Sequence, residues 1–339
     1  MELFRPAGPV GLSVVLPVYN ESANIGPLLD RLLPVLERIT ESYEVVFVDD
    51  GSADATLAAI AGHHAREPRI GAVSFSRNFG KEIAIAAGLD HARGDAVVIM
   101  DSDLQHPPEL IETFVARWRE GNVMVYAQRR DRDDETAMRR GFAHLFYRLF
   151  ARFGEMPLPE GAGDFRLIDR KGVEVLRSLP ERARFSKGLY SWIGFRSVGV
   201  PYTVEERAHG TSKWSFRKLF RFAFDGMTSF STVPLRVWTY VGGAVATLAL
   251  AMAVYFIAET LLRGPDVPGY ASLIVSVMFF SGVQLMSLGI IGEYIGRIFA
   301  EVKRRPLYVV ADRVGPAALG RTGPVREERT GLAGFTGAI

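Results

Sequence analysis

The chain has 339 residues, of which 48% are hydrophobic and 23% are charged, a composition that excludes intrinsic disorder for most of its length. Its net charge is only +2, so bulk charge gives no support to nucleic-acid binding. Cysteine is absent, which excludes disulfides, zinc–thiolate sites and cysteine nucleophiles.

Residues 11 to about 130 alternate between short apolar runs and segments with helical periodicity. Apolar runs predict strands, and the intervening segments predict helices; the strands are expected at 12–17, 45–48, 70–75, 96–100 and 123–127. Strands that alternate with helices form a mostly parallel sheet covered by helices on both faces. Ligands of such sheets bind outside the carboxyl ends of the strands.

Acidic residues follow three of these predicted strands. They occur in PVYNE at 17–21, VDDGS at 48–52 and DSDLQ at 101–105. One such turn is typical of an ordinary helix cap, but three at one sheet edge would repel each other without a cation or hydrogen-bond donors. The Asp101-Ser102-Asp103 sequence suits Mg²⁺ or Mn²⁺, which prefer carboxylate oxygens and leave coordination positions for phosphate. The chain has neither a Gly-x-Gly-x-x-Gly nor a Walker A motif, which argues against dinucleotide and P-loop chemistry.

Two stretches, 240–258 and 270–291, contain no charged residue. As helices, stretches of this length would span about 30 Å, so they predict a transmembrane hairpin with helices at about 238–262 and 270–296. The alternative is a pair of buried helices in a large core. Basic residues before and after the pair outnumber the single Arg263 between them, which predicts that both termini are cytoplasmic.

The regions on either side of this hairpin are predicted separately. Aromatic and basic residues recur at helical spacing within 211–235, which predicts an amphipathic helix in the membrane interface, with a core helix as the alternative. Residues 301–339 are predicted to be a flexible cytoplasmic tail. These boundaries leave 1–210 as the catalytic domain and 236–300 as the membrane-spanning part.

Six motifs occur in a characteristic order: PVYNE, VDDGS, SRNFGKE, MDSDLQHPPE, GDFRLIDR and GTSKW. Together they resemble a family 2 glycosyltransferase of the polyprenyl-phosphate branch, which includes bactoprenol glucosyltransferases and, more distantly, dolichol-phosphate mannosyltransferases. The resemblance covers about 12–215 and, with the two apolar stretches, extends to about 310. It implies an α/β fold of GT-A type, with a Rossmann-like domain that binds a nucleotide sugar.

The resemblance also implies roles for particular residues. The nucleotide sugar would be held by Pro17, Tyr19, Glu21, Val48, Asp50, Asp101 and Ser102. Mg²⁺ or Mn²⁺ would be held by Asp101, Asp103 and Gln105. The catalytic residues would be Asp103 and Asp164. The lipid phosphate that the family uses as acceptor would itself need cationic side chains, and the candidates are Arg129, Arg139 or Arg140, Arg207 and Lys213.

Three residues have alternatives that the sequence leaves open. The family implies that Asp164 is a base, but a phosphate monoester has a second pKa of about 6 and needs little deprotonation, so Asp164 could instead orient the acceptor. The turn at 77–81 opens a helix, and a helix start favours an anion nearby, so Lys81 could lie beside a bound anion. The alternative is a structural turn in which Lys81 is solvated. His106 is expected to be structural rather than a metal ligand.

The expected protein is a multi-pass enzyme of the inner membrane with its catalytic domain in the cytoplasm. It would transfer a hexose, with UDP-glucose as the first choice of donor, to undecaprenyl phosphate by an inverting, metal-dependent displacement. The lipid-linked sugar would serve modification of cell-envelope glycans. GDP-mannose, UDP-N-acetylhexosamine and UDP-formamidoarabinose are alternative donors, and a non-catalytic membrane scaffold is the alternative of another class. The expected partners are the nucleotide sugar, the polyprenyl phosphate, the lipid bilayer and further copies of the chain, but no nucleic acid.

Overall fold

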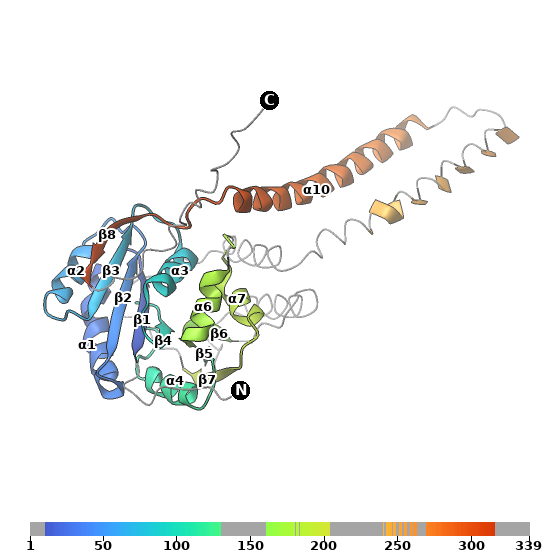
Figure 1. Cartoon of the computed structure of the whole chain (residues 1–339). Helices are drawn as coiled ribbons and strands as arrows, with labels where there is room; N and C mark the ends of the chain where they lie inside the picture. Colours follow the sequence, from blue (N-terminus) through green and yellow to red (C-terminus); the bar gives the residue numbers. More distant parts are fainter. Residues whose placement is uncertain are drawn as a thin grey trace, which may run out of the picture.

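One mixed β-sheet organises the part of the chain that the computed structural model describes, which comprises residues 11–129, 161–179, 181–182, 184–203 and 269–315 and isolated residues between 240 and 262. Within these residues the sheet has eight strands in the order β7-β5-β6-β4-β1-β2-β3-β8 (Figure 1). The strands are β1 (Leu12–Val18), β2 (Tyr43–Asp49), β3 (Ile70–Phe75), β4 (Ala96–Ile99), β5 (Met124–Arg129), β6 (Ala162–Asp169), β7 (Ser197–Tyr202) and β8 (Val310–Val314).

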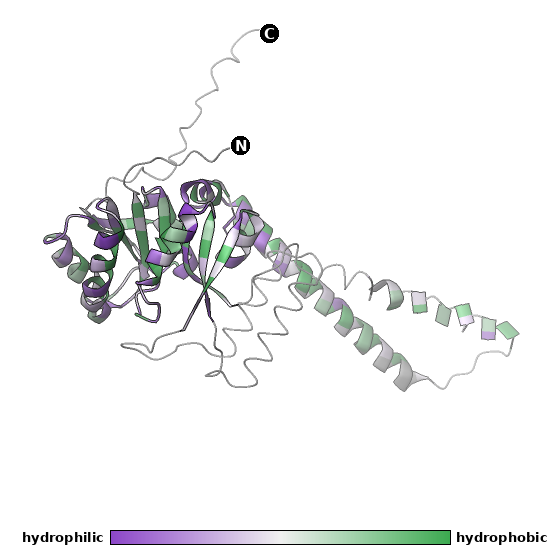
Figure 2. Ribbon diagram, turned by 90° about the horizontal axis from the view of Figure 1, so that it is seen from below, coloured by the Kyte–Doolittle hydropathy of each residue, from purple (hydrophilic) through white to green (hydrophobic). Residues whose placement is uncertain are grey.

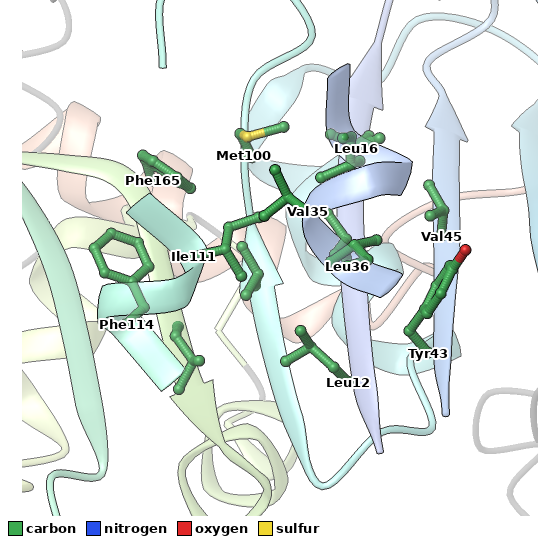
Figure 3. Packing of buried hydrophobic residues seen from close by; sticks show 14 of the residues in the cluster. Leu12, Leu16, Val35, Leu36, Tyr43, Val45, Met100, Ile111, Phe114 and Phe165 are labelled. Atoms are coloured by element: carbon green, nitrogen blue, oxygen red, sulfur yellow. The ribbon is translucent and has the colours of Figure 1, made fainter. Parts of the chain in front are cut away.

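Helices cover both faces of this sheet, as the alternating sequence pattern predicts. The described helices are α1 (Ser22–Ile39), α2 (Thr56–His64), α3 (Lys81–His91), α4 (Leu110–Arg119), α6 (Arg170–Ser178), α7 (Ser186–Trp192) and α10 (Tyr270–Val302). Successive side chains of a strand point to opposite faces, so Val14 and Leu16 pack in the core that holds α1, α2 and α4, whereas Val15 packs with α3, α6 and α7. Figure 3 shows the first of these two cores.

Close packing on the second face depends on a glycine. A Cβ atom added to Gly88 of α3 would lie 2.1 Å from a methyl group of Val15 in β1. Only a residue without a side chain lets the helix approach the strand this closely. The close approach fixes α3 against the centre of the sheet, and its first residue, Lys81, is thereby held near the carboxyl ends of the strands.

The strand register explains which loops meet. β1 runs parallel to both β2 and β4, so the turns that follow these strands lie at one edge of the sheet. β6 is antiparallel to β4, and Arg166 lies opposite Ile99. Continued by two residues, this register brings Asp164 near the start of β6 beside Asp101, which follows β4. An antiparallel strand inserted among parallel ones thus joins two distant sequence motifs.

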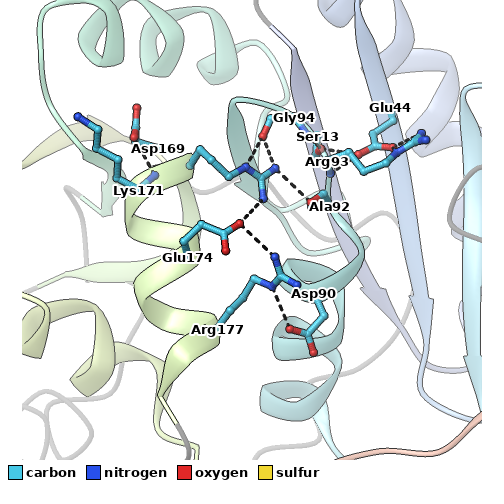
Figure 4. Close-up of polar contacts among 11 residues, drawn as sticks. Ser13, Glu44, Asp90, Ala92, Arg93, Gly94, Asp169, Lys171, Glu174 and Arg177 are labelled. Carbon is cyan, nitrogen blue, oxygen red and sulfur yellow. Dashed lines mark hydrogen bonds and ion pairs between the residues drawn. The ribbon is translucent and has the colours of Figure 1, made fainter. Parts of the chain in front are cut away.

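A polar cluster fixes the opposite edge of the sheet (Figure 4). The Glu44 carboxylate accepts hydrogen bonds from the Ser13 hydroxyl at 2.6 Å and from the backbone N–H and guanidinium of Arg93. Arg177 of α6 pairs with Asp90 of α3 at 3.3 Å. These contacts hold the helices at their ends remote from the acidic turns.

The segment after α10 returns to the sheet. β8 pairs with β3 in antiparallel register, with Arg313 opposite Val73. The Tyr308 ring stacks on Phe75 at 5.0 Å, and its hydroxyl donates a hydrogen bond to Asp90 at 3.1 Å. The prediction that the whole of 301–339 is a flexible tail is therefore wrong for 310–314. This segment pairs with the edge of β3, and the stacking of Tyr308 on Phe75 holds the chain just before it. Residues 316–339 lie outside the described part.

α10 has 33 residues and leads away from the sheet, and it carries many hydrophobic residues (Figures 1 and 2). Within the part of the chain that the structure describes, no helix combines the length and the apolar character needed to cross a membrane. This finding contradicts the predicted multi-pass location in the inner membrane. That prediction rested on two stretches without charged residues, 240–258 and 270–291, and the structure describes the first of them only in part. The predicted interfacial helix at 211–235 lies outside the described residues.

Candidate active site

The turns after β1 and β2 form one wall of the site and are bound to each other. Asn20 adopts a left-handed backbone conformation (φ 55°), which asparagine tolerates better than most residues. Its side-chain oxygen accepts a hydrogen bond from the Ala53 N–H at 2.8 Å, and its own N–H donates to the Ser52 hydroxyl at 2.9 Å. Tyr19 beside it is 43% exposed, so its ring is accessible to a ligand. Glu21 precedes α1 and accepts a hydrogen bond from the Asn24 side chain.

Asp50 is occupied by contacts within the protein. Its carboxylate accepts hydrogen bonds from the backbone N–H groups of Phe79 at 2.6 Å and Gly80 at 2.9 Å, and so holds the turn that leads into α3. Burial raises the pKa of Asp50, and the two N–H groups only partly oppose this effect. The neighbouring Gly51 has φ 71°, and a Cβ atom there would lie 2.5 Å from the Arg77 backbone. Both residues therefore maintain the shape of the wall.

Pro17 and Val48 lie opposite each other in the register of β1 and β2. The Val48 side chain is completely buried in the core beneath α3. Of these two predicted nucleotide-sugar ligands, Val48 therefore has only its backbone available to a ligand, whereas Pro17 is half-buried.

Lys81 connects the two carboxylates that the strand register brings together. Its ammonium lies 2.8 Å from Asp101 Oδ1 and 2.9 Å from Asp101 Oδ2, and it also lies 2.8 Å from Asp164 Oδ2. Among the described residues, no group forms a hydrogen bond with the other Asp164 oxygen, the buried Oδ1. Two motifs predicted to act together are thus joined by a lysine for which the sequence left two roles open.

The charges of Lys81, Asp101 and Asp164, called the trio below, stabilise each other. Burial raises the pKa of Asp101, but the Lys81 ammonium outweighs it and the net pKa is well below the ordinary value. The pKa of Asp164 is lowered in the same way, with Lys187 as a second nearby cation. Burial lowers the pKa of Lys81, and the two carboxylates more than reverse this effect. All three groups are therefore charged near neutral pH, and together they carry one negative charge.

His106 supports the trio from the side. Its Nε2 atom lies 3.8 Å from Asp101 Oδ2, and its Nδ1 atom lies 3.0 Å from the Tyr202 hydroxyl. The imidazole packs against the Phe165 ring, with centroids 5.1 Å apart. This environment agrees with the expectation that His106 is a structural residue.

A buried polar layer lies beneath Asp164. The Glu82 carboxylate accepts hydrogen bonds from the Ser186 backbone N–H at 3.0 Å and from its hydroxyl, and so ties α3 to α7. Arg166 is 3% exposed, and its guanidinium carbon lies 3.7 Å over the Tyr190 ring. Burial and the Asp164 charge raise the pKa of Glu82. The motif GDFRLIDR therefore supplies both Asp164 and the buried arginine that supports it two residues later on the same face of β6.

The turn after β4 contains the predicted metal ligands. Ser102 is buried, and the Gln105 N–H donates a hydrogen bond to Asp103 Oδ1 at 3.2 Å. Among the described residues, no three His, Asp or Glu side chains are arranged to hold a metal ion. The predicted ligands nevertheless suit a hard divalent cation, because Asp101 and Asp103 have carboxylate oxygens, Gln105 has an amide oxygen, and the trio of Asp101, Asp164 and Lys81 retains a net negative charge.

Only one of the residues predicted to bind the acceptor phosphate lies within the described part of the chain. Arg129 ends β5 opposite Tyr202 of β7, near the His106 side of the site. Arg139, Arg140, Arg207 and Lys213 lie outside the described residues. Lys187 was not predicted; it follows Ser186 on α7, and its charge acts on Asp164. A lysine at the start of a short helix gives no sequence signal of this role.

Comparison with known proteins extends over nearly the whole chain. The family described as glycosyl transferase family 2 matches residues 13–177, and the GtrB C-terminal hairpin matches 233–298. The chain is 50% identical over 306 residues to an uncharacterized glycosyltransferase of Synechocystis sp., a match that covers 90% of this chain and 96% of that one. It is 44% identical over 299 residues to a prophage-derived bactoprenol glucosyl transferase of Shigella flexneri, covering 88% and 97% respectively. A solved mannosyltransferase from Pyrobaculum calidifontis, in complex with GDP-Man and Mn²⁺, is similar with a TM-score of 0.48 at 19% identity, covering 87% of this chain and 88% of that one.

Proposed function

The chain belongs to glycosyl transferase family 2, and from this premise we propose that it transfers glucose from UDP-glucose to a polyprenyl phosphate such as undecaprenyl phosphate. The observation that carries the proposal is the ionised pair of Asp101 and Asp164, held by one ammonium at the ligand-binding edge of the sheet. Support for the substrates comes from the Shigella flexneri relative, whose name states a bactoprenol acceptor and a glucosyl group and which is matched over 97% of its length.

The reaction is a single displacement at the anomeric carbon. An oxygen of the acceptor phosphate forms the new C–O bond while the bond to the diphosphate breaks, so the configuration inverts and UDP leaves. Asp101, Asp103 and Gln105 would hold Mg²⁺ or Mn²⁺, which neutralises the charge that grows on the departing diphosphate.

Asp164 acts on the acceptor side. Lys81 holds its Oδ2 atom, which leaves Oδ1 to accept a hydrogen bond from the phosphate or from a sugar hydroxyl. Because a phosphate monoester is already largely ionised near pH 7, Asp164 has at most one residual proton to take. Its lowered pKa suits a role that orients the acceptor better than a role as a strong base.

Other nucleotide sugars are the main alternatives to UDP-glucose as the donor. GDP-mannose, UDP-N-acetylhexosamine and UDP-formamidoarabinose would react by the same displacement, and discrimination among hexoses depends on hydrogen bonds to individual hydroxyls. No observation favours a non-catalytic scaffold, since a scaffold has no use for two carboxylates whose ionised state is maintained beside an open turn.

The test is transfer of radiolabelled sugar to undecaprenyl phosphate in detergent, with Mg²⁺ or Mn²⁺, across a panel of UDP- and GDP-sugars. We expect saturable product from UDP-glucose that disappears with EDTA. Asp103→Asn and Asp164→Asn should each lower kcat by about a hundredfold or more while the protein stays folded. Lys171→Met, a change on the exposed surface of α6, serves as the matched control. Transfer from another donor alone would replace glucose, and no transfer from any donor would refute the function.

A further inference from the structure

Both oxygens of the Asp101 carboxylate are in contact with the Lys81 ammonium, at 2.8 and 2.9 Å. A divalent cation held by Asp101 needs at least one of these oxygens as a ligand. The ammonium and the cation would then lie within a few ångströms of each other, and two positive charges at that distance repel. Binding of the metal therefore requires Lys81 to move or another negative charge to arrive.

The ammonium is held near Asp101 from several sides. Lys81 is the first residue of α3, and the turn before it is fixed by the hydrogen bonds of Asp50 to Phe79 and Gly80. The next residue, Glu82, is tied to Ser186. The second carboxylate, Asp164, holds the ammonium at 2.8 Å. Lys81 is thus an internal counter-ion of the site rather than a solvated lysine.

The Lys81 side chain remains accessible to a ligand. The Lys81 side chain is 45% exposed, although it contacts two carboxylates that are 27% and 16% exposed. A lysine ammonium has three N–H donors and suits phosphate as a point charge. A nucleoside diphosphate that enters along the turn after β4 can therefore accept a hydrogen bond from Lys81 and draw it away from Asp101.

We propose that Lys81 competes with the divalent cation for Asp101, so that the cation binds tightly only together with the diphosphate of the donor. Lys81 is in this sense a positioning residue, which keeps Asp101 and Asp164 near each other before the substrates bind and then turns toward the phosphate. The inference rests on the proposed function, because it takes the ligand to be a nucleotide sugar. It adds an order of events, in which metal and donor enter as one unit.

The experiment measures Mn²⁺ binding directly by the electron paramagnetic resonance signal of free Mn²⁺, with and without UDP. We expect the wild-type protein to bind Mn²⁺ weakly alone and much more tightly with UDP, after subtraction of a Mn²⁺–UDP blank. Lys81→Met should tighten Mn²⁺ binding without UDP by about tenfold, as expected for removal of one nearby charge at a partly exposed site. The enhancement by UDP should shrink by a similar factor.

Three further variants make the result specific. Lys81→Arg keeps the charge and should bind Mn²⁺ as the wild type does, Lys171→Met should also leave the affinity unchanged, and Asp101→Asn should lose the binding. If Lys81→Met does not fold by circular dichroism, Lys81→Gln, which removes the charge but keeps a hydrogen-bond donor, takes its place.

Unchanged or weaker Mn²⁺ binding without UDP in the uncharged variant would overturn the proposal, as would full binding by Asp101→Asn. The titration needs no sugar transfer. A wild-type protein that binds Mn²⁺ as expected but transfers no sugar would therefore refute the proposed function and leave this result intact.

Discussion

Asp101 and Asp164 keep their negative charges in a partly buried site because they share one lysine. Burial by itself would raise both carboxyl pKa values above the ordinary 3.8, and the Lys81 ammonium reverses the direction. Removal of either carboxylate would leave the other paired with lysine, but removal of the lysine would leave two carboxylates with no counter-charge between them. The lysine is therefore the residue on which the electrostatics of the site depend most.

This dependence predicts how acid unfolds the protein. A carboxyl group with a lowered pKa contributes stability that is present above its unfolded pKa and is lost as the pH falls through its folded pKa. In the wild type this loss lies below pH 3.8 for both carboxylates. In Lys81→Met the effect of burial dominates, so the acid midpoint, measured by circular dichroism in EDTA, should move up by about one pH unit. An unchanged midpoint, or the same upward shift in Lys81→Arg, would contradict this account.

At the scale of elements, α7 is held in place by one carboxylate from α3. Glu82 accepts two hydrogen bonds from Ser186 at the start of α7, and the pair is partly buried. α7 carries Tyr190 against Arg166 and Lys187 near Asp164, so the anchor fixes the layer beneath the site.

Ser186→Ala removes one of these two hydrogen bonds and should lower the free energy of unfolding by about 1–2 kcal/mol. Glu82→Ala should cost about 2–3 kcal/mol, because it leaves a buried hydroxyl and a buried N–H without an acceptor. Urea denaturation gives both values. Ser178→Ala, which alters an exposed hydroxyl on α6, should stay within about 0.5 kcal/mol of the wild type. Equal effects of Ser178→Ala and Ser186→Ala would show that α7 is not anchored in this way.

Sequence periodicity predicted β1 to β5 well because each is a short apolar run, and each of the first four precedes a helix. It did not predict β6, which lies between β4 and β5 although it comes later in the chain. Periodicity describes single elements and contains no information on such insertions. The motifs placed Asp101 and Asp164 in one site, but the contact of Lys81 with both depends on residues 20 and 83 positions away. The role of β8 was missed because Asp312 and Arg313 interrupt the apolar residues of its short sequence, VADRV.

For the molecule as a whole, two hydrophobic cores lie on opposite faces of one sheet, and β8 completes the edge of that sheet. β8 and Tyr308 together cover β3, whose residues are all buried. The edge strand of a sheet has unpaired backbone N–H and C=O groups that can pair with another chain. By covering β3, β8 therefore protects the catalytic domain from such pairing.

Deletion of residues 304–339 should therefore both destabilise the protein and make it self-associate. Loss of the stacked tyrosine and the paired strand should cost about 3 kcal/mol or more. Differential scanning fluorimetry and size-exclusion chromatography measure the two effects. Deletion of 317–339, which retains β8, is the matched control and should behave as the full chain. A monodisperse 304–339 deletion with an unchanged Tm would show that β8 contributes little.

The late position of β8 also has a consequence for biosynthesis. β3 leaves the ribosome early, whereas the strand that covers it is among the last described segments to be made. Until then the nascent domain displays an unpaired, hydrophobic strand to its surroundings, which is a state prone to wrong pairing. Polysomes translating this chain at high density would bring such edges from neighbouring nascent chains together. Fewer ribosomes on each message, or a chaperone at the β3 edge, should accordingly raise the yield of native protein.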